Sequence, residues 1–306
     1  MFVILYISPF WSLQNRLIFI PEKEIRPQMD KEKVLKEIQS NIRSGDIRLA
    51  SGQISELAGQ FRDDPFTLLT CASLLKVIGD EKGAEDIAGR ICGTVRDKDG
   101  LEAAKGLRRI GFPHEAEMIL SAAAESEEVI REKMYVLFDM GKYAESAKMY
   151  GSLANPTLND TAKMIGSVSA CREHDRAVLM AKELLAEAPD DPEVQRCFCA
   201  ALSAAGRSKE AGKFVRDNQK KNRSPDADAL AAYYLWIEGK TASAGAYASK
   251  AVKADPGNTM AMEILAYCLA EKGKLQDART VAGAINEEDP GNPAVIRILD
   301  ACRGAK

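Results

Sequence analysis

The sequence is poor in the residue types that carry catalysis and metal binding. It has only two histidines, His114 and His174. The helical repeat described below places each in a turn between helices, where we expect a solvent-exposed loop residue rather than a partner for a nucleophile or metal. The glycines are isolated and form no phosphate-binding loop. We therefore expect no catalytic residue, no metal site, no cofactor, and a protein that is not an enzyme.

The sequence also lacks a cysteine framework. Its seven cysteines are an odd number, and none form a Cys-x-x-Cys pair. Cys197 and Cys199 are separated by a single residue, so on a helix they would point to different faces and could not hold one metal ion. This usage favours free thiols in a reducing compartment, and we expect a cytoplasmic protein.

Aromatic residues make up only 6% of the chain, and neither sign of charge dominates, since the net charge is -3. Such a balance gives no general attraction for nucleic acid or anionic lipid. Few stretches alternate with a period of two, and helix-forming residues fill nearly every segment. The composition therefore predicts an all-α fold.

No apolar run is long enough for a standard membrane span. Residues 1–28 come closest, but Pro9 and the run Gln14–Arg16 interrupt them well short of the roughly 20 apolar residues that a span needs. A basic start and a small-residue cleavage site are also missing. We interpret 1–28 as an apolar tail preceding a start at Met29, through an over-long gene assignment or a mobile extension. A membrane anchor and a segment packed on the fold are the alternatives.

One motif occurs twice near the C-terminus. Asp-Pro-Gly-Asn stands at positions 255–258 and again at positions 289–292. These residue types favour turns and end helices. Recurrence at this distance indicates a boundary between copies of one structural unit.

A second pattern covers most of the chain: a glycine followed five positions later by a small residue. Its eight sites recur at a near-constant step of roughly 30–34 residues, as expected of a helical repeat. Arg172 replaces glycine in the fifth site. The pairs are Gly45–Ala50, Gly79–Ala84, Gly111–Ala116, Gly141–Ser146, Arg172–Ala177, Gly206–Ala211, Gly239–Ala244 and Gly273–Ala278.

Each unit is predicted to be two antiparallel helices. In the last full copy, apolar residues at helical spacing precede Gly273, which can end a helix in the left-handed conformation at little steric cost. A second helical stripe follows until Pro290. The small residue is expected where the two helices approach most closely. Short spacings around the copies that start near Glu127 and Leu158 predict trimmed helices or an irregular joint.

This pattern resembles the tetratricopeptide repeat family, whose unit is about 34 residues long. The family has small residues at positions 8 and 20 and proline near position 32. With Gly273 as position 15, these are Ala266, Ala278 and Pro290. The resemblance covers about residues 31–292. It implies an all-α, right-handed superhelical solenoid of about eight helix–turn–helix repeats (29–292), ending in a short capping helix within 293–306.

In this family the first helices of the repeats line a concave groove that binds peptides or proteins. The resemblance therefore implies a non-catalytic protein–protein interaction scaffold whose partner the sequence does not identify. By the repeat register, positions 2, 5, 9 and 12 face the groove, and a basic stretch followed by a more aromatic half suits a partner with acidic and apolar residues. The candidate groove residues are Lys105, Arg108, Tyr135, Phe138, Tyr233, Trp236 and Tyr267. Taken singly, each is more often a packing or solvent-facing residue.

Three alternatives remain open. The first is a nucleic-acid-binding solenoid, although the acidic isoelectric point argues against it. The second is a membrane-tethered assembly factor, which depends on residues 1–28. The third is self-association through an uncovered end repeat. The nucleic-acid alternative would use Lys36, Arg43, Lys76, Lys98, Lys105 and Arg108.

Overall fold

The computed structural model describes residues 30–95, 97–289 and 291–304, and within them the regular structure is helical. Seventeen α-helices and one short 3-10 helix follow one another along this part of the chain. The all-α fold is confirmed, with eight antiparallel helix pairs and one further helix at the end. The tail expected at 1–28 lies outside the described residues.

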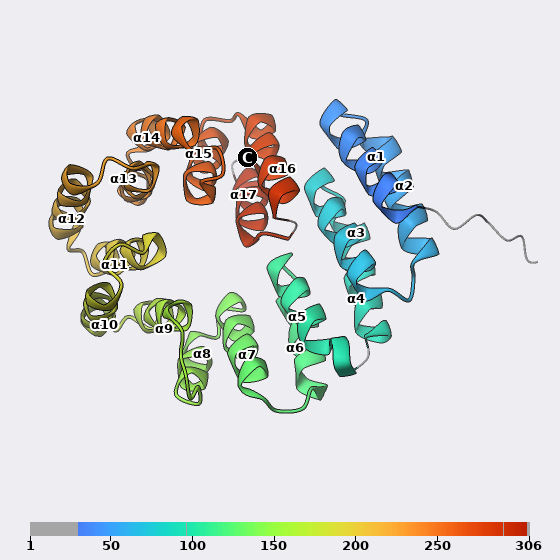
Figure 1. Cartoon of the computed structure of the whole chain (residues 1–306), viewed down its shortest axis with the longest axis horizontal. Helices are drawn as coiled ribbons and strands as arrows, with labels where there is room; N and C mark the ends of the chain where they lie inside the picture. The colour runs from blue at the N-terminus through green and yellow to red at the C-terminus, as the bar shows by residue number, and fades with distance from the viewer. Residues whose placement is uncertain (1–29, 96, 290, 305–306) are drawn as a thin grey trace, which may run out of the picture.

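The helices form consecutive pairs around an arc (Figure 1). Their bounds are α1 Lys31–Ser44, α2 Ile47–Gln60, α3 Pro65–Ile78, α4 Glu81–Thr94, α5 Gly100–Arg109, α6 Pro113–Ala122, α7 Glu127–Asp139, α8 Tyr143–Tyr150, α9 Leu158–Ala170, α10 His174–Glu187, α11 Pro192–Ala204, α12 Ser208–Lys221, α13 Pro225–Ile237, α14 Thr241–Ala254, α15 Thr259–Glu271, α16 Leu275–Glu288 and α17 Pro293–Gly304, with the 3-10 helix η1 at Asp97–Asp99.

The turn inside each pair uses the predicted glycine. All seven of these glycines have a positive φ, between 72° and 86°. Arg172, the residue that replaces glycine in the fifth pair, has the same left-handed backbone with φ 66°. The repeat register is therefore correct even where the sequence departs from it.

The small residue five positions after each turn is fully buried. All eight of these residues, Ser146 included, have 0% of their surface exposed. Here the two helices of a pair meet, and a larger side chain would force them apart.

Helix starts follow ordinary capping chemistry. The side chain of Asp30 accepts hydrogen bonds from the backbone N–H groups of Glu32 and Lys33 at the start of α1, as expected. Asp64 and Asp191 cap α3 and α11 in the same way. Both of these helices have proline at their first position, where no backbone N–H is needed.

Trimmed helices were predicted near Glu127 and Leu158, and the structure has one in the fourth pair, but the fifth pair, which starts at Leu158, has ordinary helices of 13 and 14 residues. Helices α5 and α6 have 10 residues each and α8 has 8, whereas most of the others have 13 or 14. Lys98, one of the cations of the nucleic-acid alternative, lies in η1. The chain therefore spends fewer residues on helix in the third and fourth pairs, which explains the short spacings.

The array bends until its two ends meet (Figure 1). Helices α16 and α17 contact α3, although they stand at opposite ends of the repeat array. Helix α17 also packs on α15 and α16, as expected of a terminal helix that covers the last pair. The closure into a ring was not predicted. None of the helices in the described part of the chain is long and apolar enough to span a membrane.

Candidate functional site

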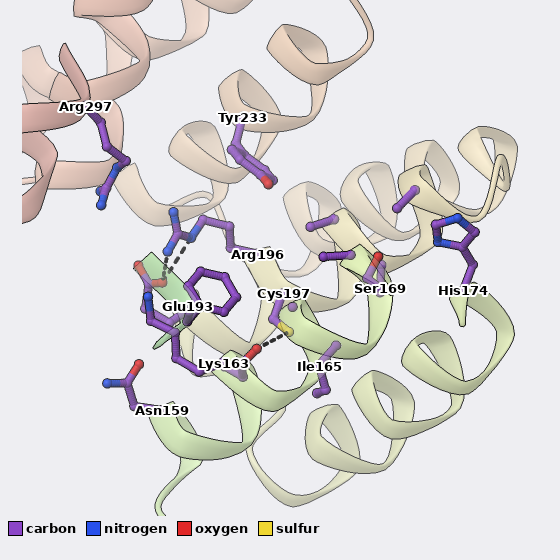
Figure 2. A pocket seen from close by; sticks show the side chains of 17 residues that line it. Asn159, Lys163, Ile165, Ser169, His174, Glu193, Arg196, Cys197, Tyr233 and Arg297 are labelled. Atoms are coloured by element: carbon purple, nitrogen blue, oxygen red, sulfur yellow. Dashed lines mark hydrogen bonds and ion pairs between the residues drawn. The ribbon is translucent and has the colours of Figure 1, made fainter. Parts of the chain in front are cut away.

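A cavity of about 540 Å³ opens on the inner face of the ring (Figure 2). It lies between α9 and α11, and α7, α10, α13 and α17 each contribute one lining residue. We call it the inner cavity. Its volume is within the range of about 300–1,000 Å³ that is usual for ligand pockets.

The hollow exists because α9 and α11 carry small side chains where they face each other. Ala162, Gly166, Ala200 and Ala204 line it, and such residues fill little of the space between two helices. A Cβ atom placed on Gly166 would come within 3.0 Å of the ring of Phe138. The glycine therefore lets this ring lie close to the α9 backbone.

Two aromatic rings form walls of the inner cavity. Phe138 packs edge-to-face on Tyr143, with 5.4 Å between ring centroids. Tyr233 enters from α13, and burial raises the pKa of its hydroxyl to about 12, so it stays neutral at physiological pH. The walls offer apolar contact to a bound side chain.

Three cations line the inner cavity from three different helices: Lys163 on α9, Arg196 on α11 and Arg297 on α17. Glu193 is the carboxylate among the lining residues, and it accepts a hydrogen bond of 2.9 Å from Nε of Arg196. Arg297 is held from α15 by the two carboxylate oxygens of Glu263, at 2.5 and 2.9 Å. The lining residues themselves thus carry three cations and one carboxylate, and Asp139 and Glu263, which lie outside the lining, are the partners of Lys163 and Arg297.

Lys163 lies in a crowded cationic environment. Its Nζ is 3.5 Å from a carboxylate oxygen of Asp139 and 4.2 Å from the ring centre of Phe138. Burial lowers the pKa of Lys163, and the nearby charges of Arg108 and Arg297 lower it further, against the opposing effect of Asp139. A ligand carboxylate at this position would relieve the repulsion between the cations.

Two further residues that line the inner cavity, Cys197 and His174, carry titratable side chains. Burial raises the pKa of the Cys197 thiol to about 11, so it remains protonated at neutral pH. His174 has a buried Nδ1 with no hydrogen-bond partner in the described structure. All seven cysteines are free. Among the described residues, no group of three or more His, Cys, Asp or Glu side chains could hold a metal ion.

The expectation that both histidines lie in turns between helices was wrong. His174 is the first residue of α10, and His114 belongs to the first turn of α6. Both second helices start immediately after the turn, so the boundary falls earlier than expected. His114 is exposed, whereas His174 is half-buried and lines the inner cavity.

Of the predicted groove residues, Phe138 and Tyr233 line the inner cavity. Lys105 is outside it and pairs with Glu102 at 2.7 Å. Trp236 stacks on Tyr267 with 4.7 Å between centroids.

Both members of that stack are bonded to carboxylates of their own chain. Trp236 donates its indole N–H to Glu271 at 3.0 Å, and Tyr267 donates its hydroxyl to Glu263 at 2.5 Å. The stack and the Trp236–Glu271 hydrogen bond connect α13 with α15, whereas the Tyr267–Glu263 hydrogen bond lies within α15.

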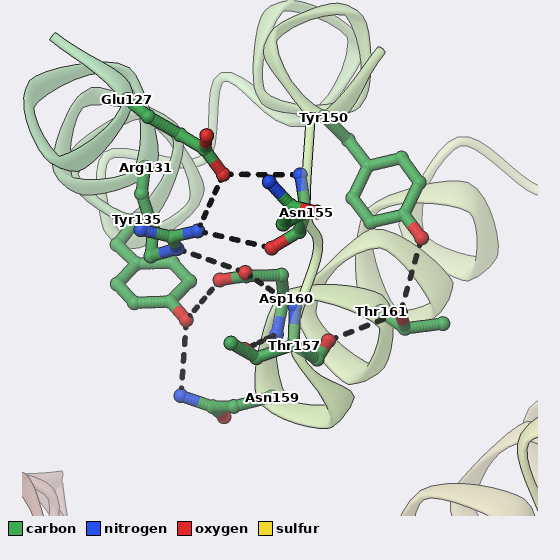
Figure 3. A network of polar contacts seen from close by, with 9 residues as sticks. All are labelled: Glu127, Arg131, Tyr135, Tyr150, Asn155, Thr157, Asn159, Asp160 and Thr161. Carbon is green, nitrogen blue, oxygen red and sulfur yellow. Dashed lines mark hydrogen bonds and ion pairs between the residues drawn. The ribbon is translucent and has the colours of Figure 1, made fainter. Parts of the chain in front are cut away.

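Arg108 and Tyr135 belong to contacts between neighbouring repeats. Arg108 donates to Glu132 at 2.5 Å and to Asp139 at 3.2 Å, and its side chain is 12% exposed. The hydroxyl of Tyr135 donates to Asp160 at 2.5 Å, within a polar network at the joint between α7 and α9 (Figure 3).

Several lining residues were missed although the repeat register points to them. With Arg172 as position 15, the groove positions 2, 5, 9 and 12 of α9 are Asn159, Ala162, Gly166 and Ser169, and all four line the inner cavity. Small side chains have no chemistry that indicates a binding site in a sequence, so these positions were not predicted as groove residues. Arg297 lies in the terminal helix, outside the register, and no local pattern marked it.

Comparison with known proteins agrees with this geometry. Residues 235–302 match the family model of the tetratricopeptide repeat. The last repeats of the chain therefore match the family that the sequence pattern resembles. The matched segment covers the last repeats, and the same left-handed turn and buried small residue occur in all eight pairs. No curated protein matches the sequence at a significant level.

The comparison with solved structures matches, among others, three proteins at low identity, the first of which is described as a tetratricopeptide repeat protein. One from Parabacteroides merdae has 11% identity and a TM-score of 0.47, covering 77% of this chain and 97% of that one. Yeast Tom70 has 14% identity and a TM-score of 0.48, covering 92% of this chain and 65% of its own. MamA from Desulfovibrio magneticus has 15% identity and a TM-score of 0.32, covering 54% and 95%. Similarities at this level say nothing about ligands.

Proposed function

We propose that this chain is a non-catalytic scaffold that binds a segment of a partner protein on the inner face of its ring. The segment would place an apolar side chain in the hollow between α9 and α11 and an acidic group beside Lys163 and Arg196. The observation that carries this proposal is the inner cavity itself, which combines an apolar floor with a rim that carries three cations.

The alternative of nucleic-acid binding has less support from the charges. Of the six cations it would use, Arg43, Lys76, Lys105 and Arg108 are each within 3.4 Å of a carboxylate oxygen of the same chain. Such pairs reduce the positive field that a phosphate backbone needs. The membrane-tethered alternative depends on residues 1–28, which lie outside the described structure.

A peptide-binding experiment tests the proposal. A library of random decapeptides is selected on the full chain, and the affinity of an enriched, dye-labelled peptide is measured by fluorescence anisotropy. We expect enriched sequences that combine an acidic and a bulky apolar residue. Lys163→Ala and Arg196→Ala should each weaken binding about tenfold or more, because each removes a charge-assisted contact.

The matched controls are Lys213→Ala and Arg216→Ala on α12, which remove exposed cations outside the inner cavity. These variants should bind like the wild type. Equal loss in all four variants would indicate a general charge effect and contradict a site at the inner cavity. Selection of peptides without acidic residues would contradict the proposed ligand chemistry.

A further inference from the structure

The ring closes at a seam that no chain connection crosses. On one side stand α1 and α3–α5 with the turn at Gly111, and on the other stand α16 and α17 with the loop between them. Ile296 of α17 lies close to Gly111. A Cβ atom placed on Gly111 would be 2.9 Å from the side chain of Ile296. The two ends of the array are therefore in direct contact.

Three ion pairs cross the seam near its surface. Arg43 donates to Glu287 at 2.7 Å, and Arg109 donates to both carboxylate oxygens of Asp289 at 2.8 Å. Arg303 pairs with Glu81. Every one of these side chains is at least 34% exposed, so salt in the solvent screens all three pairs.

Apolar packing across the seam is sparse. The buried cluster of α1–α7 is separate from that of α13–α17, and partly buried Val77 of α3 packs against the second cluster. The buried contacts at the seam include the side chain of Ile110 against Gly291 and one polar contact, in which Ser73 donates to the side-chain oxygen of Asn286 at 3.1 Å. Polar groups at a contact can form hydrogen bonds with water when the two surfaces separate. Neighbouring repeats share apolar cores, and exposing these to water costs free energy.

The seam is connected to the inner cavity through α17. Ile296 contacts Gly111 across the seam, and the next residue, Arg297, lines the inner cavity. Arg303, further along the same helix, pairs with Glu81 across the seam. Because Glu263 of α15 holds Arg297, an opening of the seam that bends the array between α11 and α15 would also shift Arg297 relative to Lys163 and Arg196.

We propose that the seam is a salt-sensitive latch. The ring opens by parting α16 and α17 from α3–α5, which gives a segment in the middle of a partner chain a way into the ring. Closing places Arg297 beside the other two cations of the inner cavity. The latch does not depend on what the cavity binds, and only its effect on affinity rests on the proposed function.

Small-angle X-ray scattering on the full chain tests the latch. The reversal variant combines Arg43→Glu with Arg109→Glu, and the swap variant adds Glu287→Arg and Asp289→Arg to it. In 0.05 M NaCl we expect the reversal to increase the radius of gyration and the swap to restore the wild-type value. Arg176→Glu with Arg207→Glu is the matched control, since it reverses two exposed pairs within single helical turns away from the seam, and should leave the size unchanged.

The latch is overturned if the reversal variant scatters like the wild type, or if it expands and the swap does not restore the size. If the reversal variant loses its helical circular dichroism, the test is the size of the wild-type chain at low and high salt. Expansion between 0.05 and 0.5 M NaCl with retained helicity supports the latch, and an unchanged size overturns it.

Peptide affinity gives the link to function. With a peptide that binds the wild type, the reversal should weaken binding about tenfold, the loss expected for one charge-assisted contact, and the swap should recover it. Unchanged affinity in an expanded reversal variant would show that closure does not build the site. If no peptide binds the wild type, the proposed function fails while the scattering comparison still decides the latch.

Discussion

Arg172 shows how strongly a single backbone position is determined by the repeat. Its φ of 66° is the left-handed conformation that glycine adopts at the seven equivalent turns. A residue with a Cβ atom adopts this conformation at a cost of about 1–2 kcal/mol. The packing of α9 against α10 must therefore hold Arg172 in a strained conformation.

Replacing Arg172 with glycine should relieve this strain. We expect Arg172→Gly to raise the free energy of unfolding by about 0.5–1 kcal/mol, because glycine removes the steric cost but also gives the unfolded chain more freedom. Urea denaturation measures the change. Arg172→Ala keeps the Cβ atom and is the control, so equal stability of the two variants would contradict the argument.

The turns and the closest helix contacts could be predicted from the sequence because both depend on a residue type at a fixed spacing. Glycine is chosen for its backbone freedom, and the small residue for the space available at the contact. The inner cavity depends instead on what is missing, namely side-chain volume at Ala162, Gly166 and Ala200. An alanine in a sequence does not show whether the space beside it is filled, so this part could not be predicted.

At the scale of helices, the joint between α7 and α9 depends on polar contacts (Figure 3). Helix α8 is only 8 residues long, and the chain between it and α9 is irregular. Asp160 is 0% exposed and accepts from Arg131 Nε at 2.9 Å, from the Tyr135 hydroxyl and from the backbone N–H of Thr157. The carboxylate thus joins α7 to α9 beside the short helix.

Burial by itself would raise the pKa of Asp160, but the hydrogen bonds from Thr157, Tyr135 and Arg131 outweigh it and lower the pKa. A lowered pKa in the folded state means that the charged carboxylate stabilises the fold at neutral pH. That contribution is complete above the unfolded-state value of about 3.9 and is lost as the pH falls through the lower folded-state value.

We expect Asp160→Asn to lower the free energy of unfolding at pH 7 by about 3 kcal/mol, because Arg131 loses its buried charged partner. The difference from the wild type should shrink below about pH 4, where the Asp160 carboxylate of the unfolded wild-type chain takes up a proton while that of the folded chain is still charged. Denaturant unfolding at several pH values measures it.

Tyr150→Phe is the control for this joint, since it removes a neutral hydrogen bond of 3.0 Å to Thr161. It should cost about 1 kcal/mol with no dependence on pH in this range. A difference between Asp160→Asn and the wild type that stays constant from pH 7 to pH 3 would show that the charge of Asp160 does not stabilise the joint.

At the scale of the whole molecule, α17 has two neighbours that are far apart in the sequence. It covers α15 and α16 of the last repeats and also touches α3. Val295, Ile298 and Leu299 are at most 5% exposed, so most of its apolar face is buried. The sequence predicted that a terminal helix covers the last pair, but not that this helix contacts α3. Ring closure is the sum of small rotations between eight successive pairs, and no local sequence pattern indicates it.

Ending the chain at Asn292 should therefore destabilise the array. We expect a loss of about 5 kcal/mol from the buried apolar side chains of α17, and a lower midpoint of thermal unfolding followed by circular dichroism. Arg303→Ala, which removes two exposed ion pairs, with Glu81 across the seam and with Asp300 on the same helix, should cost about 1 kcal/mol or less. An unchanged midpoint in the shortened chain would contradict a structural role for α17.

Closure also fixes the size of the array. An open solenoid can grow by duplication, because each new unit stacks on the free face that the last one leaves. In this chain α16 and α17 of the last repeats lie against α3 of the second pair. A ninth pair would leave no room for α17 beside α3, so the chain can gain or lose a whole unit only by ceasing to be a ring.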